Sequence, residues 1–238
     1  MTSSGTYNFS LSDGECVLEA FERCQVRMPE IRQEHMASAR RNLNLLLSEL
    51  STRQVNLWKV EFNTIDLVQG TATYDVPTRV VMILDAYRAI NYGSSDQTNI
   101  YTTPISRTEY ASYAAPQTQG PPTVYWFDRL ISPTVTFFPT PDGNGPYTWG
   151  YYSCIQMQDA NLPGGETPDV PYRALSMLTA GLAYYLSLSW PPQGVDQIAF
   201  QNARLAEFNR VFAPFASNDT ENVNMSLVPS LSAYYRRG

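Results

Sequence analysis

The segment 170–190, VPYRALSMLTAGLAYYLSLSW, constrains the fold of this chain more than any other stretch. No charged residue occurs between Arg173 and Asp196. At helical spacing one side of the segment carries large residues and another carries small ones, so a helix formed here is apolar nearly all round. Because a surface helix keeps one polar face, this helix must lie inside a helical bundle or inside a membrane. The large stripe consists of Leu175, Leu178, Leu182 and Leu186, and the small stripe of Ser176, Ala180, Ala183 and Ser187.

A membrane span needs about 20 apolar residues, and the uncharged window is close to that length. Serine and threonine hydroxyls lower the hydrophobicity of the segment, however, and Pro191-Pro192 ends it. No cluster of Lys or Arg flanks either end to set an orientation. We therefore expect a bundle helix and no membrane contact. The small stripe should mark the place where another helix, of the same chain or of a second copy, packs closest.

Three other segments are predicted to be helices that surround this one. Ser12 and Glu15 have capping-box spacing, which predicts a short helix to about Gln25. Pro29 predicts the start of a longer helix to about Ser51, because a proline in the first turn loses no hydrogen bond. A third helix is predicted beyond Asp196. The apolar faces are expected to contain Ile31, Ala39, Leu43, Leu46, Leu47 and Leu50 in the longer helix, and Ile198, Leu205, Phe208, Phe212 and Phe215 in the last one. The outer face of the last helix should carry Gln197, Gln201, Arg204, Glu207 and Arg210.

From Leu57 the hydrophobic period changes to that of strands. The pattern predicts a strand pair with a turn at Gln69-Gly70, then a one- or two-turn helix after Ser106 and a hairpin turn at 142–145. Further strands are predicted over 79–90, 100–105, 123–127, 134–138 and 147–156. The fold class is therefore α+β. We expect a discontinuous helical bundle over 1–56 and 163–217, an inserted small antiparallel β-domain over 57–162, and an extended C-terminal tail over 218–238.

Composition argues against several functions. The formal net charge is −6 and the isoelectric point is about 4.8, which argues against a basic groove that grips nucleic acid. Lys59 is the only lysine among the basic residues, and arginine is the cation that suits protein interfaces. The three cysteines, Cys16, Cys24 and Cys154, form no CxxC pair, so we expect buried free thiols in a reducing cytoplasm.

Motifs for catalysis or metal binding are largely missing. His35 is the only histidine, and the Glu-x-x-His pattern of a di-iron site does not recur, so we expect neither a metal nor a cofactor. Two alternatives to a structural role stay open. In the first, a pair of carboxylates would serve a cell-wall glycan hydrolase. In the second, aromatic residues of the β-domain would stack on sugars in a carbohydrate-binding module, although packing in the core and between subunits explains these aromatic residues as well. These aromatic residues are Trp58, Tyr125, Trp126, Tyr147, Trp149, Tyr151 and Tyr152.

The C-terminal stretch from Ser217 is polar and poor in helix formers. It carries Val228 and Pro229 and ends in an aromatic and arginine cluster made of Tyr234, Tyr235, Arg236 and Arg237. Tyr and Arg dominate binding energies at interfaces, which favours docking into a neighbouring subunit or a partner. A disordered terminus is the alternative.

Six segments, in this order, resemble the head-to-tail adaptor proteins of tailed bacteriophages, the family of tail tubular protein A and the portal accessory factors of short-tailed phages. The resemblance runs over about residues 30–215. The segments are LLLSELSTRQVNLWKVE, IDLVQGTATYDVPTRVVMI, PISRTEYASY, GPPTVYWFDR, VTFFPTPDGNGPYTWGYYS and LPGGETPDVPYRALSMLTAGLAYYLS.

This resemblance implies a structural protein made in the host cytoplasm and placed in the neck of the virion. It implies a ring, typically of twelve subunits, that docks under the portal, offers a platform to the tail tube or nozzle, helps retain packaged DNA and gives it a passage on ejection. The C-terminal tail would reach the portal through Tyr234, Tyr235, Arg236 and Arg237. An acidic chain suits a lumen that lets DNA pass without sequence-specific binding.

Overall fold

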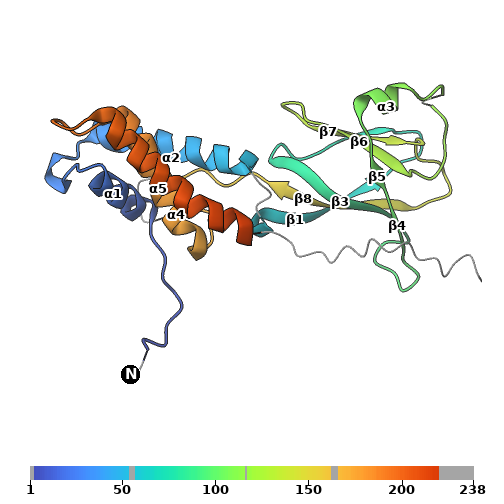
Figure 1. Ribbon diagram of the computed structural model, residues 1–238. Coiled ribbons are helices and arrows are strands. Elements are labelled where there is room, and N and C mark those ends of the chain that lie inside the picture. Colours follow the sequence, from blue (N-terminus) through green and yellow to red (C-terminus); the bar gives the residue numbers. More distant parts are fainter. Residues whose placement is uncertain (1–2, 54–56, 116, 162–165, 220–238) are drawn as a thin grey trace, which may run out of the picture.

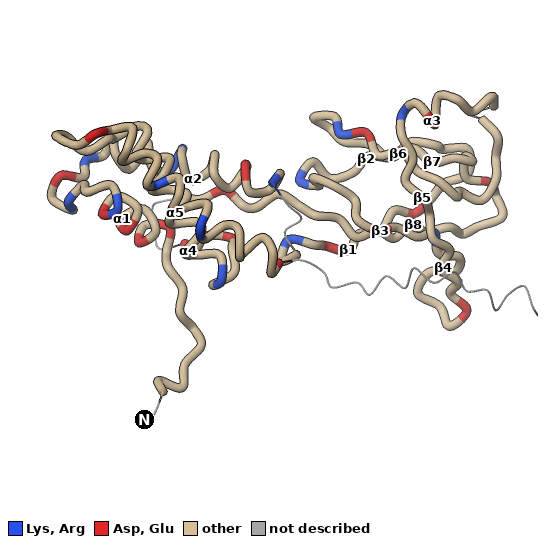
Figure 2. The backbone as a smooth tube through the Cα atoms, viewed as in Figure 1, with Lys and Arg blue, Asp and Glu red and all other residues tan. Residues whose placement is uncertain are grey.

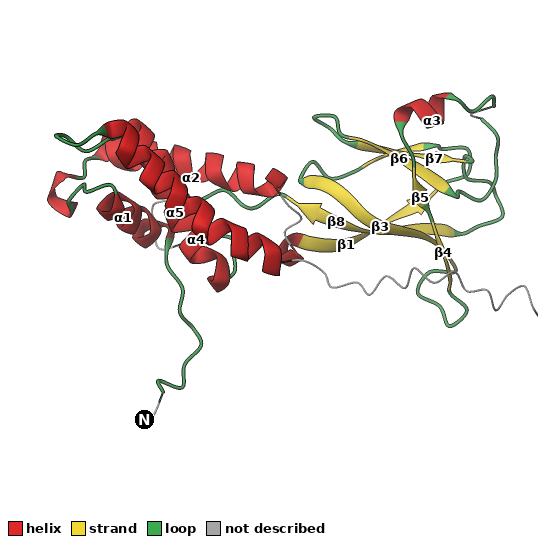
Figure 3. Ribbon diagram, in the orientation of Figure 1, coloured by secondary structure: helices red, strands yellow, loops and turns green. Residues whose placement is uncertain are grey.

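The computed structural model describes residues 3–53, 57–115, 117–161 and 166–219. Its helices and strands are separated in space: four long helices lie together at one end, and the strands form the other end (Figures 1 and 3). The fold is α+β. The helices are α1 (Asp13–Arg23), α2 (Gln33–Arg53), α4 (Leu175–Ser189) and α5 (Gln197–Asn218), with a short α3 (Arg107–Ala111) among the strands.

Helix α4 is the centre of the helical part, and α1, α2 and α5 each pack against it. All four leucines of its large stripe are buried, and Leu178, Leu182 and Leu186 belong to a core that contains residues from all four helices. No helix among the described residues is long and apolar enough to cross a membrane. The apolar faces of α4 are therefore buried inside a helical bundle.

The start of α1 is fixed by the predicted capping box. The amide of Glu15 donates to Ser12 Oγ at 3.2 Å, and the amide of Ser12 donates to Glu15 Oε2 at 2.8 Å. Each contact satisfies an amide that the helix itself leaves without a partner. The helix ends where Gln25 adopts a φ of 62°.

The start of the longer helix differs from the prediction. Pro29 lies in a single 3-10 turn, Met28–Glu30, and α2 begins only at Gln33, so Ile31 precedes the helix. The amide of Arg32 donates to His35 Nδ1 at 2.9 Å. The ring of His35, at the third position of α2, thus accepts from the amide just before the helix, as Glu or Gln does in a capping box, so the position of the true start was missed.

The last helix also differs in two respects. Ile198 was expected on its apolar face, yet it is 73% exposed, because the first turn of α5 extends beyond the bundle. Arg204 and Glu207 were expected outside, yet both are mostly buried. They pair at 2.7 Å, and Glu207 also pairs with Arg23 of α1 at 3.1 Å. Ionic contacts between helices therefore occupy part of the face that periodicity assigned to solvent.

The strands form two four-stranded sheets, in the orders β1-β8-β3-β4 and β2-β7-β6-β5. Tyr125, Phe137, Trp149 and Tyr151 fill the space between the sheets, and the Trp149 indole N–H donates to Thr102 Oγ1 at 3.0 Å. All pairs are antiparallel except β5 with β6. The strands are β1 (Val60–Leu67), β2 (Thr73–Asp75), β3 (Val80–Ile90), β4 (Thr98–Tyr101), β5 (Thr103–Pro104), β6 (Val124–Asp128), β7 (Thr134–Phe138) and β8 (Tyr147–Ile155).

Strand pairing corrects three predictions. β1 pairs with β8, with Val60 opposite Cys154, and not with the next strand along the chain. The turn at 142–145 joins strands of different sheets, so it is not a hairpin turn. The predicted strand 100–105 is interrupted at Thr102, and its halves β4 and β5 belong to different sheets. The buried Thr102 hydroxyl binds Trp149 at that crossing point, which a hydrophobic pattern cannot predict.

Candidate interaction surfaces

The last described residue, Asp219, is fixed at the junction between helices and strands. Its side chain is 3% exposed, and its Oδ1 accepts from Arg173 Nη2 at 2.8 Å. The amide of Leu57 lies 3.4 Å from Asp219 Oδ2. The guanidinium of Arg173 lies over the ring of Trp58, which in turn contacts Phe215 of α5. The end of α5 is thereby held against the start of α4 and the entry to β1.

A second ion pair holds the same junction. Lys59, the only lysine, is buried, and its Nζ lies 2.6 Å from Asp169 Oδ2. The same carboxylate oxygen accepts the amide of Gln158 at 2.9 Å, just beyond the end of β8. The segments that leave and re-enter the helical part are therefore tied together by one carboxylate.

The residues predicted to dock on the portal lie outside the described part of the chain. They are Val228, Pro229, Tyr234, Tyr235, Arg236 and Arg237. The structure describes the point from which this tail departs, because Asp219 directly precedes residue 220.

The small stripe of α4 is only partly buried. Ala180, Ala183 and Ser187 are buried, and Cys24 Sγ donates to the carbonyl of Ala183 at 3.2 Å, so α1 is the neighbour on that side. Ser176 is exposed and is one of the residues that line the groove between α1 and α4. The four residues therefore do not form one buried face.

A close helix approach lies at Gly181, which the small stripe did not include. A Cβ at this position would lie 2.9 Å from Leu46 Cδ2 of α2 and 3.0 Å from Phe208 Cε2 of α5. Such distances are below ordinary contact, so α2 and α5 pack directly on the backbone of α4. This contact was not predicted from the sequence, although a lone glycine in an apolar helix is the signal that could have indicated it.

Residues with catalytic or metal-binding side chains are used for packing. His35 lies against Trp190 and Phe21 at ring-centroid distances of 4.2 and 5.8 Å. All three cysteines are free and buried, and burial raises the pKa of Cys16 to about 11 and that of Cys24 to about 12. Within the described ranges, no three His, Cys, Asp or Glu side chains gather as a metal site would require.

The β-domain aromatics mainly form the core. Of those named as possible sugar platforms, Tyr125, Tyr147, Trp149 and Tyr151 are buried. Tyr152 is exposed and contacts Phe62 at a centroid distance of 5.0 Å. Most of these rings are therefore unavailable for stacking on a ligand.

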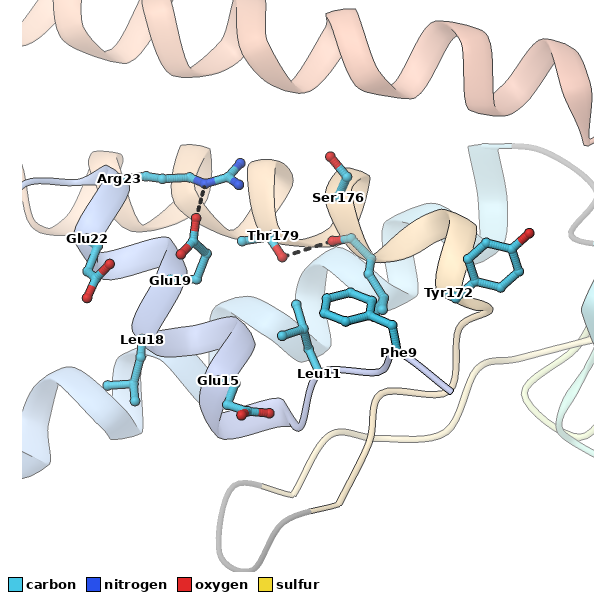
Figure 4. A pocket seen from close by; sticks show the side chains of 11 residues that line it. Phe9, Leu11, Glu15, Leu18, Glu19, Glu22, Arg23, Tyr172, Ser176 and Thr179 are labelled. Carbon is cyan, nitrogen blue, oxygen red and sulfur yellow. Dashed lines mark hydrogen bonds and ion pairs between the residues drawn. The ribbon is translucent and has the colours of Figure 1, made fainter. Parts of the chain in front are cut away.

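A groove on the outside of the helical part is lined by the N-terminal segment, α1 and the start of α4 (Figure 4). Its volume is about 520 Å³. Its lining includes the apolar side chains of Phe9, Leu11, Leu18 and Leu175, and Glu15, Glu19, Glu22 and Arg23 of α1. Glu19 is paired with Arg23 at 3.0 Å, and hydrogen bonds from Ser12 lower the pKa of Glu15, so this edge is negatively charged at neutral pH.

Comparison with known protein families identifies the class to which this chain belongs. The sequence model of the SU10 adaptor protein family matches residues 19–229. The chain therefore belongs to this family, and the resemblance to phage head-to-tail adaptors is confirmed. No curated protein matches the chain. Family membership supports a structural adaptor role in the phage particle.

Proposed function

We propose that this chain assembles into a ring, of twelve subunits by resemblance, that joins the portal of a phage head to the tail tube or nozzle. The observation that carries the proposal is the family match, which covers both the helical and the β parts and extends into the tail as far as Pro229. The ring would help retain packaged DNA and would later give it passage. Its place would be the neck of the virion.

The geometry at Asp219 supports a role of the tail in docking. The tail begins at a residue that is buried and paired with Arg173 at 2.8 Å, so its starting point is fixed relative to both α4 and α5. A fixed starting point reduces the number of positions that the aromatic and arginine cluster at 234–237 must search before it binds. We assign to these residues, with Val228 and Pro229, the contact with the portal.

The charge of the chain supports a passage that does not hold DNA. With a net charge of −6, a ring of many copies gives few phosphate contacts and repels the backbone over distances of about 10 Å at moderate salt. DNA would pass through the lumen without sequence-specific binding. A ring with its lumen lined by arginine would contradict this step.

Truncation tests the docking assignment. A chain that ends at Asp219 keeps the pair with Arg173, so it should unfold at nearly the same temperature as the full chain. Its binding to purified portal should fall at least tenfold, measured by light scattering and by electron microscopy of the mixture. A second test variant keeps the full length of the chain and replaces Tyr234, Tyr235, Arg236 and Arg237 by serine. If both variants bind portal as the full chain does, the tail does not make this contact.

A further inference from the structure

Two outward faces of the helical part carry opposite charge. On α1, Glu15 and Glu22 are exposed on the face opposite to the buried Cys16, Val17 and Ala20. Glu22 makes no ion pair within the described residues. Beside these carboxylates the groove offers apolar surface from Leu11 and Leu18 and from the exposed Phe9, as Figure 4 shows.

The complementary face lies on α2. Arg41 and Leu45 are one turn apart, on the side opposite to the buried Leu43, Leu46 and Leu50. Leu45 is 59% exposed, and neither Arg40 nor Arg41 forms an ion pair within the part of the chain that the structure describes. Small residues, Ala37 and Ser48, flank Arg41 and Leu45 on this outer face and would permit close approach.

These faces cannot meet within one copy. The buried faces of α1 and α2 belong to one core, in which Phe21 of α1 also contacts His35 of α2, so the outer face of each helix points away from that core. Figures 1 and 2 show the four helices gathered together. The acidic and basic faces therefore point away from each other, which is the geometry of a head-to-tail contact that can close into a ring.

We propose that the groove of α1 in one copy receives the Arg41 and Leu45 face of α2 from the next copy. Leu45 would lie on the apolar part of the groove, and Arg40 and Arg41 would face Glu15 and Glu22. The apolar contact supplies most of the affinity, while the charges set orientation and exclude contacts between like faces. The inference rests on the proposed ring and names the surfaces that build it.

Charge reversal tests the contact on the full-length chain with purified portal. Glu22→Lys and Arg41→Glu should each raise the concentration needed for ring formation at least tenfold, seen by electron microscopy and mass photometry. An equimolar mixture of the two variants should restore rings, because each reversed face then meets its complement on the other variant. Leu45→Ser should weaken ring assembly, and mixing it with either the Glu22→Lys or the Arg41→Glu chain should not restore rings. Circular dichroism and thermal unfolding confirm that the variants are folded.

Asp96→Lys, which changes the charge equally in the exposed β3–β4 loop, is the matched control and should assemble normally. If the folded Glu22→Lys and Arg41→Glu chains form rings as the unaltered chain does, or if mixing gives no rescue, these are not the surfaces in contact, although the proposed function stands. If the unaltered chain forms no ring with portal, the proposed function fails and this inference fails with it.

Discussion

The carboxylate of Asp219 lies 2.8 Å from the guanidinium of Arg173, at the point where α5 ends and the tail begins. A carboxylate at the C-terminal end of a helix faces the negative end of the helix dipole. Arg173 and the amide of Leu57 offset this unfavourable field, and they fix the end of α5 to the start of α4.

Removing either partner should destabilise the fold, but unequally. Arg173→Met leaves a carboxylate that is 3% exposed without its cation, whereas Asp219→Asn leaves an arginine that water already reaches. We expect losses in the free energy of unfolding of about 2 kcal/mol for Arg173→Met and about 1 kcal/mol for Asp219→Asn. Urea unfolding measures both. Equal stability of both variants and the original chain would show that the pair does not hold the junction.

The approach at Gly181 gives a sharper test. Gly181→Leu places a side chain where a Cβ alone would lie 2.9 Å from Leu46 and 3.0 Å from Phe208, and should cost about 3 kcal/mol. Ser176→Leu on the same helix, at an exposed position, should change the stability by less than about 0.5 kcal/mol. Thermal unfolding of the two variants compares them directly. Ala183→Leu, at a buried position against α1, should also destabilise.

The Lys59 and Asp169 pair should be strongly coupled. Lys59→Met leaves Asp169 without the cation that lies 2.6 Å away, and should cost about 2–3 kcal/mol. Adding Asp169→Asn to that variant should cost much less than it does alone, because the unpaired charge is then gone. Chemical denaturation of the two single variants and the double variant gives the coupling energy. Additive losses would contradict the pairing.

Alkaline pH should destabilise the chain through its buried thiols. Burial raises the pKa of Cys16 to about 11 and of Cys24 to about 12, so above pH of about 9 the unfolded chain loses protons that the folded chain keeps. Stability from these groups is complete below that pH and falls as pH rises further. A Cys16→Ala/Cys24→Ala chain should show a smaller decrease in melting temperature between about pH 9 and 11. An unchanged decrease would assign the effect to other groups.

The same burial predicts low thiol reactivity. At pH 8 the thiolate fraction of Cys16 in the folded chain should be about a hundredfold below that of an exposed cysteine, since its pKa is about 11. Iodoacetamide should therefore label the native chain very slowly and the urea-unfolded chain quickly, as mass spectrometry would show. Rapid labelling of Cys16 in the native chain would contradict its burial.

The predictions from sequence succeeded where local chemistry determines the outcome. The charge-free segment gave the central helix, and the spacing of Ser12 and Glu15 gave the start of α1, because both depend on residues within a few positions. The α+β class followed from the change of hydrophobic period at Leu57. The division into an inserted domain stays a prediction. It is supported by two separate hydrophobic clusters, one among the helices and one between the sheets.

Features that depend on distant partners were missed. β1 pairs with β8, with Val60 opposite Cys154, and the hydroxyl of Thr102 at the crossing between the sheets binds the indole of Trp149. Glu207 pairs with Arg23 of another helix, and Arg204 in turn pairs with Glu207, so both face inward. Among the candidate sites, the tail residues stay a prediction from composition, and the buried Asp219 before them was not predicted, since its partner Arg173 lies far away in the sequence.

Native mass spectrometry of the chain mixed with purified portal tests the adaptor assignment most directly. Together with electron microscopy of the same sample, it gives the number of copies bound and their arrangement. The account predicts a complex of fixed mass in which a closed ring of this chain, of about twelve copies by resemblance, covers one end of the portal. A chain that stays monomeric and does not bind portal, under conditions in which it is folded, would contradict it.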